Sequence, residues 1–281
     1  TVSITDEATF EADETYTVTL DTLTVAGGND GTANQVALDT TNPGNISGDA
    51  SVGTGTITNT DAAPVITVAA GSGTEAGNID FVVSIDKAPT SGLDAVVTYA
   101  AADSTVASAT SATDYSTTET DDDGNADSGT LTFTSAGAGG DLTISVPSTA
   151  DTIDENNETF TLTLLGAGLS NATFTGASVA DITETGTITD DDDAPQFQIT
   201  DVAVTEGTDA TVVFTIDITA VNGTTASALV PTVDYVVADG TATAASESDY
   251  TSGSVVDNDA ATTDGVATFA DESTTSVTVT V

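Results

Sequence analysis

The feature that most constrains the fold is an alternation of apolar and polar residues that continues along most of the chain. It is clear, for example, in the runs 81–85, 142–146 and 160–164. Successive side chains of a β-strand point to opposite faces, so a period of two predicts half-buried strands. Clusters of Gly, Asn and Asp separate these runs at intervals that suit an antiparallel sandwich. We therefore expect an all-β chain without helices, and we interpret the Ala-rich runs 100–112 and 242–245 as loops.

The first part of the chain follows the same pattern around an acidic loop. Residues 2–4 and 16–20 are expected to be strands, because their apolar residues alternate with polar ones. Residues 26–54 are rich in Gly, Asn and Asp, which predicts a long loop or an extended hairpin. Residues 121–125 read Asp-Asp-Asp-Gly-Asn and predict an acidic turn or hairpin tip.

Several short motifs occur twice in the same order, which indicates an internal repeat. The offset ranges from 131 residues (Gly55 to Gly186) to 144 residues (Glu14 to Glu158). The repeated pairs are Gly55-Thr56-Ile57-Thr58 with Gly186-Thr187-Ile188-Thr189, Ala63-Pro64 with Ala194-Pro195, Thr74-Glu75 with Thr205-Glu206, Asp114-Tyr115 with Asp249-Tyr250, and Glu14-Thr15-Tyr16 with Glu158-Thr159-Phe160. We expect residues 64–194 to form a complete unit, residues 1–63 the second half of another, and residues 195–281 its first half.

The phase of the repeat suggests how copies are joined. The run 277–281 corresponds to 142–146, the first residues of the chain correspond to the same strand, and the length of 281 residues is close to twice the repeat offset. We expect a window of a longer tandem array, or a protomer whose half units are completed by its neighbours. The expected partner is therefore a copy of the same chain, joined head to tail. Because Met is absent, we also expect a mature product or an excerpt of a longer protein.

Four consecutive aspartates, Asp190–Asp193, follow the strand-like run 187–189 and precede Pro195, which opens the next extended run. Two carboxylates about 4 Å apart repel each other by roughly 1 kcal/mol in water and about 4 kcal/mol near a protein surface. A cation bound at this junction would relieve the repulsion. Oxygen ligands from Asp and Glu favour a hard ion, with Ca²⁺ as the first choice. The alternative is a solvated acidic linker in an acid-rich chain.

The charge balance excludes several classes of partner. The chain has 45 acidic residues and one basic residue, Lys87, so its formal net charge is −44. Nucleic acid and anionic membrane surfaces would repel such a chain. No apolar run approaches the roughly 20 residues that span a bilayer, so membrane insertion is not expected. The charge requires compensating cations, either from high salt or from bound divalent ions.

The composition also argues against catalysis. His, Cys and Arg are absent, so most nucleophilic and acid–base mechanisms lack their groups, and neither disulfides nor thiolate metal sites can form. A carboxylate pair of the glycosidase kind is conceivable. Acid pairs are abundant throughout the chain, however, and Trp is absent as a sugar platform. We expect that the protein is not an enzyme.

Read in order, the complete unit contains Glu75-x-Gly77, Asp114-Tyr115, Gly129-Thr-Leu-Thr-Phe133, Asp151-x3-Glu155-x2-Glu158-Thr-Phe160, and Gly186-Thr-Ile-Thr followed by aspartates. This order resembles the Calx-β domain family, which occurs in regulatory regions of sodium–calcium exchangers and in large bacterial surface proteins. The resemblance covers the whole chain as one complete and two half domains. It implies tandem Ig-like antiparallel β-sandwiches that bind Ca²⁺ at one end, near the junction to the next domain.

The resemblance implies two sets of Ca²⁺ ligands. In the complete unit the ligands would be Glu75, Asp114, Asp151, Glu155, Asp190, Asp191 and Asp192. In the split unit they would be Glu206 and Asp249 together with Asp6, Glu7, Glu11 and Asp61. Strand-end loops gather at the poles of a sandwich, so the first set can converge. The second set has only Asn59-Thr60-Asp61 in place of the aspartate run, so we expect that site to be weaker or lost.

The leading functional hypothesis is a structural repeat segment of an extracellular filament or cell-surface fibre, stiffened by Ca²⁺ at the junctions between domains. An alternative is a Ca²⁺-dependent adhesion module that binds a surface glycan or protein through the loops 26–54 and 116–129. A third reading is an acidic spacer from a halophile, stabilised by monovalent salt alone. Four sequons, which permit surface glycosylation, occur at Asn45, Asn157, Asn171 and Asn222.

Overall fold

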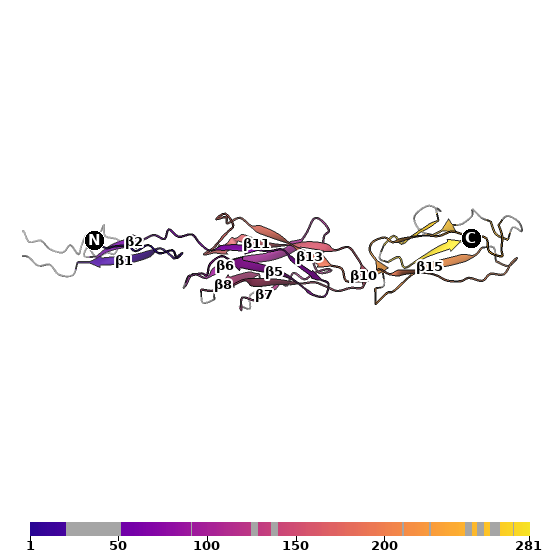
Figure 1. Ribbon diagram of the computed structural model, residues 1–281, viewed down its shortest axis with the longest axis horizontal. Helices are drawn as coiled ribbons and strands as arrows, with labels where there is room; N and C mark the ends of the chain where they lie inside the picture. The colour runs from indigo at the N-terminus through magenta and orange to yellow at the C-terminus, as the bar shows by residue number, and fades with distance from the viewer. Residues whose placement is uncertain are drawn as a thin grey trace, which may run out of the picture.

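The computed structural model describes residues 1–20, 52–90, 92–124, 129–135, 140–209, 211–224, 226–244, 249–251, 256–258, 265–271 and 273–281. These residues form β-strands and turns and contain no helix, and therefore no helix that could cross a membrane. The all-β prediction is thus confirmed for the described part of the chain. Figure 1 shows three successive groups of strands, in the N-terminal segment (1–63), the central segment (64–194) and the C-terminal segment (195–281).

The central segment contains two five-stranded sheets. The first has the order β4-β13-β11-β6-β8, with β13 parallel to β4 and the other neighbours antiparallel. The second has the order β12-β3-β5-β9-β7, with only β12 and β3 parallel. The strands of the first sheet are β4 (Gly71–Thr74), β6 (Ala95–Asp103), β8 (Thr130–Phe133), β11 (Glu158–Ser170) and β13 (Ile182–Thr189). Those of the second are β3 (Val65–Val68), β5 (Asn78–Ile85), β7 (Thr120–Asp121), β9 (Leu142–Pro147) and β12 (Thr173–Phe174).

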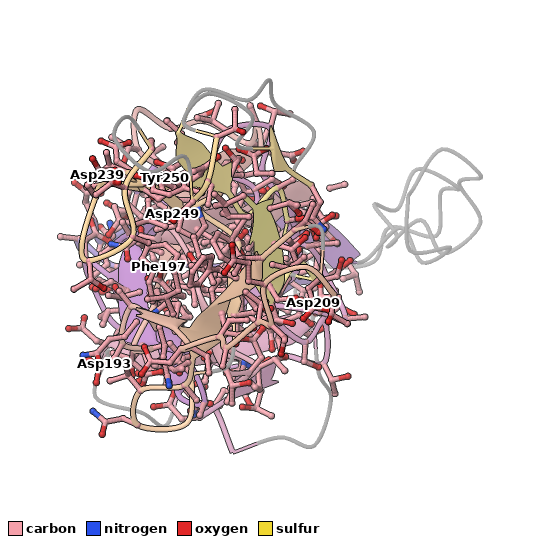
Figure 2. The ribbon with its side chains drawn as sticks, turned by 90° about the vertical axis from the view of Figure 1, so that its right-hand side faces the viewer. Asp193, Phe197, Asp209, Asp239, Asp249 and Tyr250 are labelled. Carbon is pink, nitrogen blue, oxygen red and sulfur yellow. The ribbon has the colours of Figure 1, made fainter. Side chains whose placement is uncertain are left out.

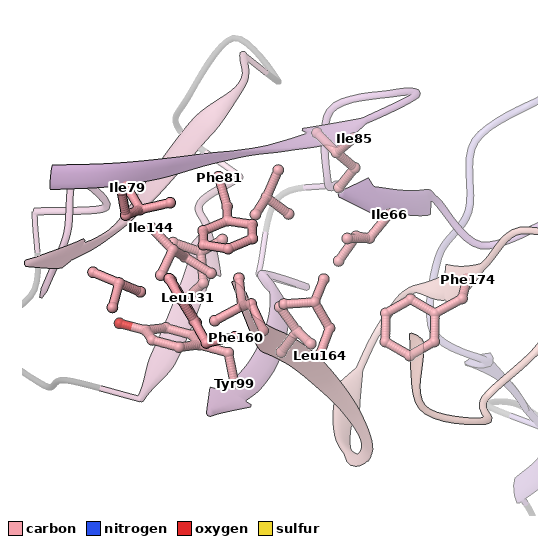
Figure 3. Close-up of a cluster of buried hydrophobic side chains, with 14 of the residues drawn as sticks. Ile66, Ile79, Phe81, Ile85, Tyr99, Leu131, Ile144, Phe160, Leu164 and Phe174 are labelled. Carbon is pink, nitrogen blue, oxygen red and sulfur yellow. The ribbon is translucent and has the colours of Figure 1, made fainter. Parts of the chain in front are cut away.

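Side chains from both sheets share one hydrophobic core (Figure 3). The alternating residues of β5 and β11 supply its centre, where Phe81, Phe160 and Leu164 are fully buried. The Phe160 ring stacks on Tyr115 with centroids 4.5 Å apart, and it meets the Phe81 ring edge-on at 5.8 Å. Burial of one such side chain stabilises the fold by about 1.5–3 kcal/mol. This core fixes the strand ends on which the acidic residues lie.

The N-terminal segment contributes one antiparallel hairpin, β1 (Glu14–Thr19) with β2 (Val52–Ile57). The prediction of a strand at residues 2–4 is wrong, because residues 1–13 contain no strand and Val2 and Ile4 are each 54% exposed. A strand needs a neighbour with which to exchange hydrogen bonds. The corresponding strand of the central segment, β9, lies between β5 and β7, and residues 1–20 include no counterpart of either. The predicted loop 26–54 lies outside the described residues up to residue 51, and the rest begins β2.

The C-terminal segment has a four-stranded sheet in the order β14-β15-β20-β18 and a two-stranded sheet of β17 and β19. The four-stranded sheet matches the order β3-β5-β9-β7, and Phe214 lies opposite Val279 as Phe81 lies opposite Ile144. Its small core consists of Ile216, Ala267, Phe269, Val277 and Val279. The strands are β14 (Gln196–Ile199), β15 (Val213–Thr219), β17 (Thr232–Asp234), β18 (Val256–Asp257), β19 (Val266–Thr268) and β20 (Ser276–Thr280).

Two loop predictions need correction. Residues 100–103 of the first Ala-rich run belong to β6, because they pair with β11 through Phe160 to Thr163. Residue 121 of the expected acidic turn belongs to β7, which pairs with β9. Small Ala side chains give no periodic signal in the sequence, although the backbone of residues 100–103 pairs with β11.

Candidate metal centre

The candidate site lies where two parallel strands end side by side. In the pairing of β4 with β13, Thr74 lies opposite Thr189. Glu75 follows β4 directly and Asp190 follows β13 directly. The Glu75 amide donates a hydrogen bond to the Thr189 carbonyl at 3.3 Å. Because parallel strands end at the same edge of a sheet, this pairing brings the predicted glutamate and the aspartate run together.

Three of the predicted ligands form a group that could hold a metal ion. One carboxylate oxygen from each of Glu75, Asp191 and Asp192 lies within 4.8 Å of the others. Glu75 is buried, with 8% of its surface exposed, whereas Asp192 is half-buried and Asp191 is exposed. The group therefore combines an inner carboxylate, at the end of the sheet, with two from the link that leads to the next segment.

The remaining predicted ligands surround this group. The Asp151 amide donates to Glu75 Oε2 at 3.4 Å, so the loop between β9 and β11 lies against the inner carboxylate. Glu155 lies in the same loop, where the charges of Asp151, Asp114, Glu75 and Asp190 act on it. The structure thus gathers all seven acids of the first set at one end of the central segment. Their role as metal ligands stays a prediction.

Three acids of the site, Glu75, Glu155 and Asp190, have raised pKa values, with burial as the first cause and neighbouring charges as a further one. Burial is the first cause for Glu75, whose pKa is raised to about 7, and the charges of Asp151, Asp190 and Asp192 raise it further. Burial followed by the charge of Asp151 raises the pKa of Glu155 to about 7. The pKa of Asp190 is also raised, first by burial and then by neighbouring charges. Such shifts show that the negative charge of the group is poorly compensated by the protein.

The group has features that a bound cation would satisfy. Asp190 Oδ1 and Asp192 Oδ2 are buried and have no hydrogen-bond partner among the described residues. The one basic side chain of the chain, Lys87, donates from Nζ to the Ala62 carbonyl at 2.6 Å, at the junction with the N-terminal segment. No Lys or Arg is therefore left to neutralise the acids near Glu75, and an all-oxygen donor set suits a hard divalent ion.

Residues of the C-terminal segment contact the same acids. Thr224 Oγ1 donates to Asp192 Oδ1 at 3.2 Å, and Asn222 Nδ2 donates to Asp193 Oδ2. Two residues of the central segment, β10 (Ile153–Asp154), pair in parallel with β16 (Ala226–Ser227), and Ser227 Oγ donates to Asp154 Oδ2 at 2.7 Å. The candidate site therefore lies at the junction of the two segments.

The second predicted set is not assembled within one chain. Asp6, Glu7, Glu11 and Asp61 line a cleft of about 590 Å³ in the N-terminal segment. Burial, followed by the charges of Glu7 and Glu14, raises the pKa of Glu11. Glu206 and Asp249 are exposed on the C-terminal segment, beyond the central segment from this cleft (Figure 1). One chain thus holds the two halves of this set apart.

Asp249 nevertheless has a local geometry like that of Asp114. Each precedes a tyrosine whose hydroxyl donates to an aspartate, Tyr115 to Asp103 at 2.7 Å and Tyr250 to Asp239 at 2.6 Å (Figure 2). Asp114 Oδ2 accepts from the Thr110 amide at 2.6 Å, and Asp249 Oδ2 accepts from the Thr243 amide at 2.9 Å. The loop that places Asp249 is therefore formed without the acids of the N-terminal segment.

Sequence reasoning missed several members of the site. Burial, then the charges of Asp114 and Glu155, raises the pKa of Glu158 to about 7. Glu158 belongs to the repeated Glu-Thr-Phe motif, which was a signal that could have identified it. Asp154 and Thr224 had no such signal, because their role depends on how the segments meet.

Three of the four sequons take part in local structure, and the fourth, Asn45, lies outside the described residues. The Asp190 amide donates to Asn157 Oδ1 at 3.3 Å, inside the acidic group. Asn171 and Asn222 have φ values of 53° and 50°. The side-chain amide of Asn171 donates to the Asp94 backbone carbonyl, and that of Asn222 donates to the Asp193 carboxylate. All three asparagines have structural roles that do not require a glycan.

No family model matches the chain, and a search of curated proteins gave no significant match. The resemblance to the Calx-β family accordingly depends on the order of the short motifs. The site geometry stands independently of that resemblance.

Proposed function

We propose that the chain is a structural segment of an extracellular filament or cell-surface fibre, built from tandem Calx-β-like β-sandwiches and stiffened by Ca²⁺ at their junctions. Two sheets with one shared core support the sandwich architecture. The observation that carries the proposal is the position of the acids Glu75, Asp191 and Asp192, because Asp192 also accepts a hydrogen bond from Thr224 of the next segment.

Glu75, Asp191 and Asp192 would hold the ion, with Asp190 as a further donor. Bound Ca²⁺ would supply the positive charge that the chain lacks and would neutralise the repulsion among these carboxylates. Glu75 directly follows β4, while the aspartates belong to the short link before β14. Their shared ligation would restrict the angle between the central and C-terminal segments.

The composition supports an extracellular location. A net charge of −44 keeps such a protein soluble and attracts divalent cations. Extracellular modules commonly bind Ca²⁺ with dissociation constants of about 10⁻⁴–10⁻³ M. A junction that stiffens at such concentrations would be rigid outside the cell.

A calcium titration of the full chain tests the proposal. Ca²⁺ should raise the thermal midpoint, since a ligand at 100 times its dissociation constant adds about 2.7 kcal/mol of stability. The variant Asp190→Asn/Asp191→Asn/Asp192→Asn should lose most of this response, because Asn keeps the size but removes the charge. A control with the same charge change away from the junction, Asp141→Asn/Glu184→Gln/Asp217→Asn, should keep it. The proposal fails if NaCl of equal ionic strength shifts the midpoint as much as Ca²⁺.

A further inference from the structure

The described part of the C-terminal segment contains one nearly complete sheet but no counterpart of the middle of the other. In the central segment, the hairpin of β11 and β13 lies between β4 and β6. The C-terminal segment retains one flank of that sheet, the counterpart of β6 and β8. β17 and β19 pair with Val233 opposite Ala267, as β6 and β8 pair with Val97 opposite Leu131.

The backbone that would flank the missing hairpin is not in strands. In β6, residues 100–103 pair with β11. Their counterparts 136 positions later, 236–239, have no strand pairing, although the preceding β17 has formed. The counterparts of β4, residues 202–205, have no strand pairing either. Both runs, 202–205 and 236–239, correspond to strands of the central segment, but no strand among the described residues lies between them to pair with.

Apolar side chains beside the same gap are exposed to solvent. Phe197 is 38% exposed and Ile199 is 58% exposed, whereas Ile66, the counterpart of Phe197, is fully buried. An apolar hollow of about 260 Å³ lies between the remaining strands, lined by Ile199, Phe214, Ile216, Tyr235, Val236, Val237, Ala238 and Val279. In the central segment, Phe160, Leu162 and Leu164 of β11 fill the corresponding space.

The hairpin β1–β2 has the register and residue types of β11–β13. Tyr16 lies opposite Gly55 as Phe160 lies opposite Gly186. In both hairpins the aromatic ring covers the glycine so closely that an added Cβ would overlap it. Val18 and Leu20 follow Tyr16 at the spacing of Leu162 and Leu164 after Phe160, yet they are 51% and 56% exposed.

We infer that the β1–β2 hairpin of one copy inserts into the C-terminal segment of a second copy, between residues 202–205 and 236–239. The pairing of β11 with β6 gives the register. Thr163 opposite Ala100 and Leu162 opposite Ala101 place Thr19 opposite Val236 and Val18 opposite Val237. Val18 then fills the apolar hollow, and main-chain hydrogen bonds on both sides hold the hairpin.

The donor in this inference is the hairpin of a second copy, because within one chain the hairpin and the C-terminal segment lie on opposite sides of the central segment. The N-terminal segment contacts the central segment beyond the end of β5, where Lys87 donates to Ala62. The C-terminal segment contacts the other end, where Thr224 donates to Asp192 near Glu75. Because the hairpin and the C-terminal segment lie at opposite ends of the chain (Figure 1), each insertion leaves one hairpin and one gap without a partner. The contact is heterologous and produces a linear array.

This inference deepens the proposed function by naming the partner, but it does not require Ca²⁺. Disulfide trapping tests it, because the natural chain has no cysteine. Directly opposed residues of antiparallel strands lie within the Cα separation that a disulfide needs. Thr19→Cys/Val236→Cys should therefore give a ladder of covalent multimers on a non-reducing gel. The shifted control Thr19→Cys/Val237→Cys should give no ladder, since its two side chains point to opposite faces. Equal ladders, or only a bridge within one chain, would overturn the inference.

A mixing experiment guards against variants that misfold. Val18→Asp places a charge on the inserting face of the hairpin, and Val237→Asp places one in the apolar hollow. Each variant alone should therefore be monomeric by light scattering. Mixed together, they should form pairs and nothing longer, because each retains the half that the other has lost. Val106→Asp, at a site 73% exposed on the central segment, should assemble as the natural chain does. Assembly of Val18→Asp alone, or no pairing in the mixture, refutes the insertion. Both experiments are run in chelator and in Ca²⁺, so that a ladder without a Ca²⁺ response separates this inference from the proposed function.

Discussion

The central and C-terminal segments have the same sheet but not the same core. Both contain four strands in one order and register, as Phe81 opposite Ile144 and Phe214 opposite Val279 show. Phe81 is fully buried, whereas Phe214 is only half-buried and the neighbouring Ile199 is 58% exposed. The difference is the hairpin of β11 and β13, which has no counterpart among the described residues of the C-terminal segment. The comparison teaches that this hairpin closes the core and also supplies the acids at its end.

The largest difference in the free energy of unfolding is expected when the aromatic residue at the centre of each hairpin is removed. Phe160→Ala should destabilise the central segment by about 3–5 kcal/mol, because it opens a cavity beside Phe81 and Tyr115. The matched variant Tyr16→Ala should cost far less in dilute protein, since Tyr16 is half-buried on a hairpin with little core. Chemical denaturation of the full chain measures both. Equal losses would show that the hairpin β1–β2 is already packed within one chain.

Substitutions at the equivalent glutamates of the two segments, Glu75 and Glu206, should have different effects on Ca²⁺ binding. Glu75→Gln should remove most of the Ca²⁺ stabilisation, which amounts to about 2.7 kcal/mol at 100 times the dissociation constant. In chelator the same change should raise stability, because it removes repulsion. Glu206→Gln should leave both quantities unchanged in dilute protein, since Glu206 is exposed. Calorimetric titration would contradict the account if the two variants lost equal Ca²⁺ binding.

Substitutions at the equivalent glycines of the two hairpins, Gly186 and Gly55, should give a smaller difference in stability. A Cβ at Gly186 would lie 2.5 Å from Phe160 and 2.9 Å from Phe81. Since both rings are locked in the core, Gly186→Ala should cost about 1–3 kcal/mol through overpacking. The ring over Gly55 is Tyr16, which can turn away, so Gly55→Ala should cost less. Thermal midpoints of the two variants provide the measurement, and a reversed order would contradict the packing argument.

The pH dependence of stability should have opposite directions in chelator and in Ca²⁺. Glu75, Glu155 and Glu158 have pKa values raised from 4.5 to about 7, with burial as the first cause. In chelator, the folded state therefore holds protons that the unfolded state releases. Their contribution to stability is complete below pH 4.5 and is lost as the pH rises through 7. With Ca²⁺ the trend should reverse, because protons compete with the ion. Melting curves that show no opposite trends in chelator and Ca²⁺ would count against the site.

The sequence predicted those parts of the fold in which side chains carry the signal. Strands such as β5, β9 and β11 alternate large apolar residues, and the structure contains each of them. β4 reads Gly-Ser-Gly-Thr, and its place in the sheet depends on backbone pairing with β13. Residues 2–4 show the opposite failure, since they alternate correctly but lack a neighbouring strand. The sequence pattern shows which residues favour a strand, whereas strand formation also requires a neighbouring strand to pair with.

The candidate site was predictable for a similar reason. Acids placed directly after strand-like runs, such as Glu75 and Asp190, gather when those strands run parallel. Asp154 and Thr224 enter only through the contact between segments, which no local pattern encodes. The split set of acids lies on two separate segments of the described chain, and its assembly is part of the proposed insertion.

Amide hydrogen exchange along residues 236–239 tests the central claim most directly. Their counterparts, residues 100–103 of β6, should be protected at every protein concentration, because β11 covers them. In dilute protein residues 236–239 should exchange rapidly, as backbone without a strand partner does. When the protein self-associates, they should become protected alongside β1 and β2. Rapid exchange of residues 236–239 in the associated protein would contradict the claim that one copy completes the next.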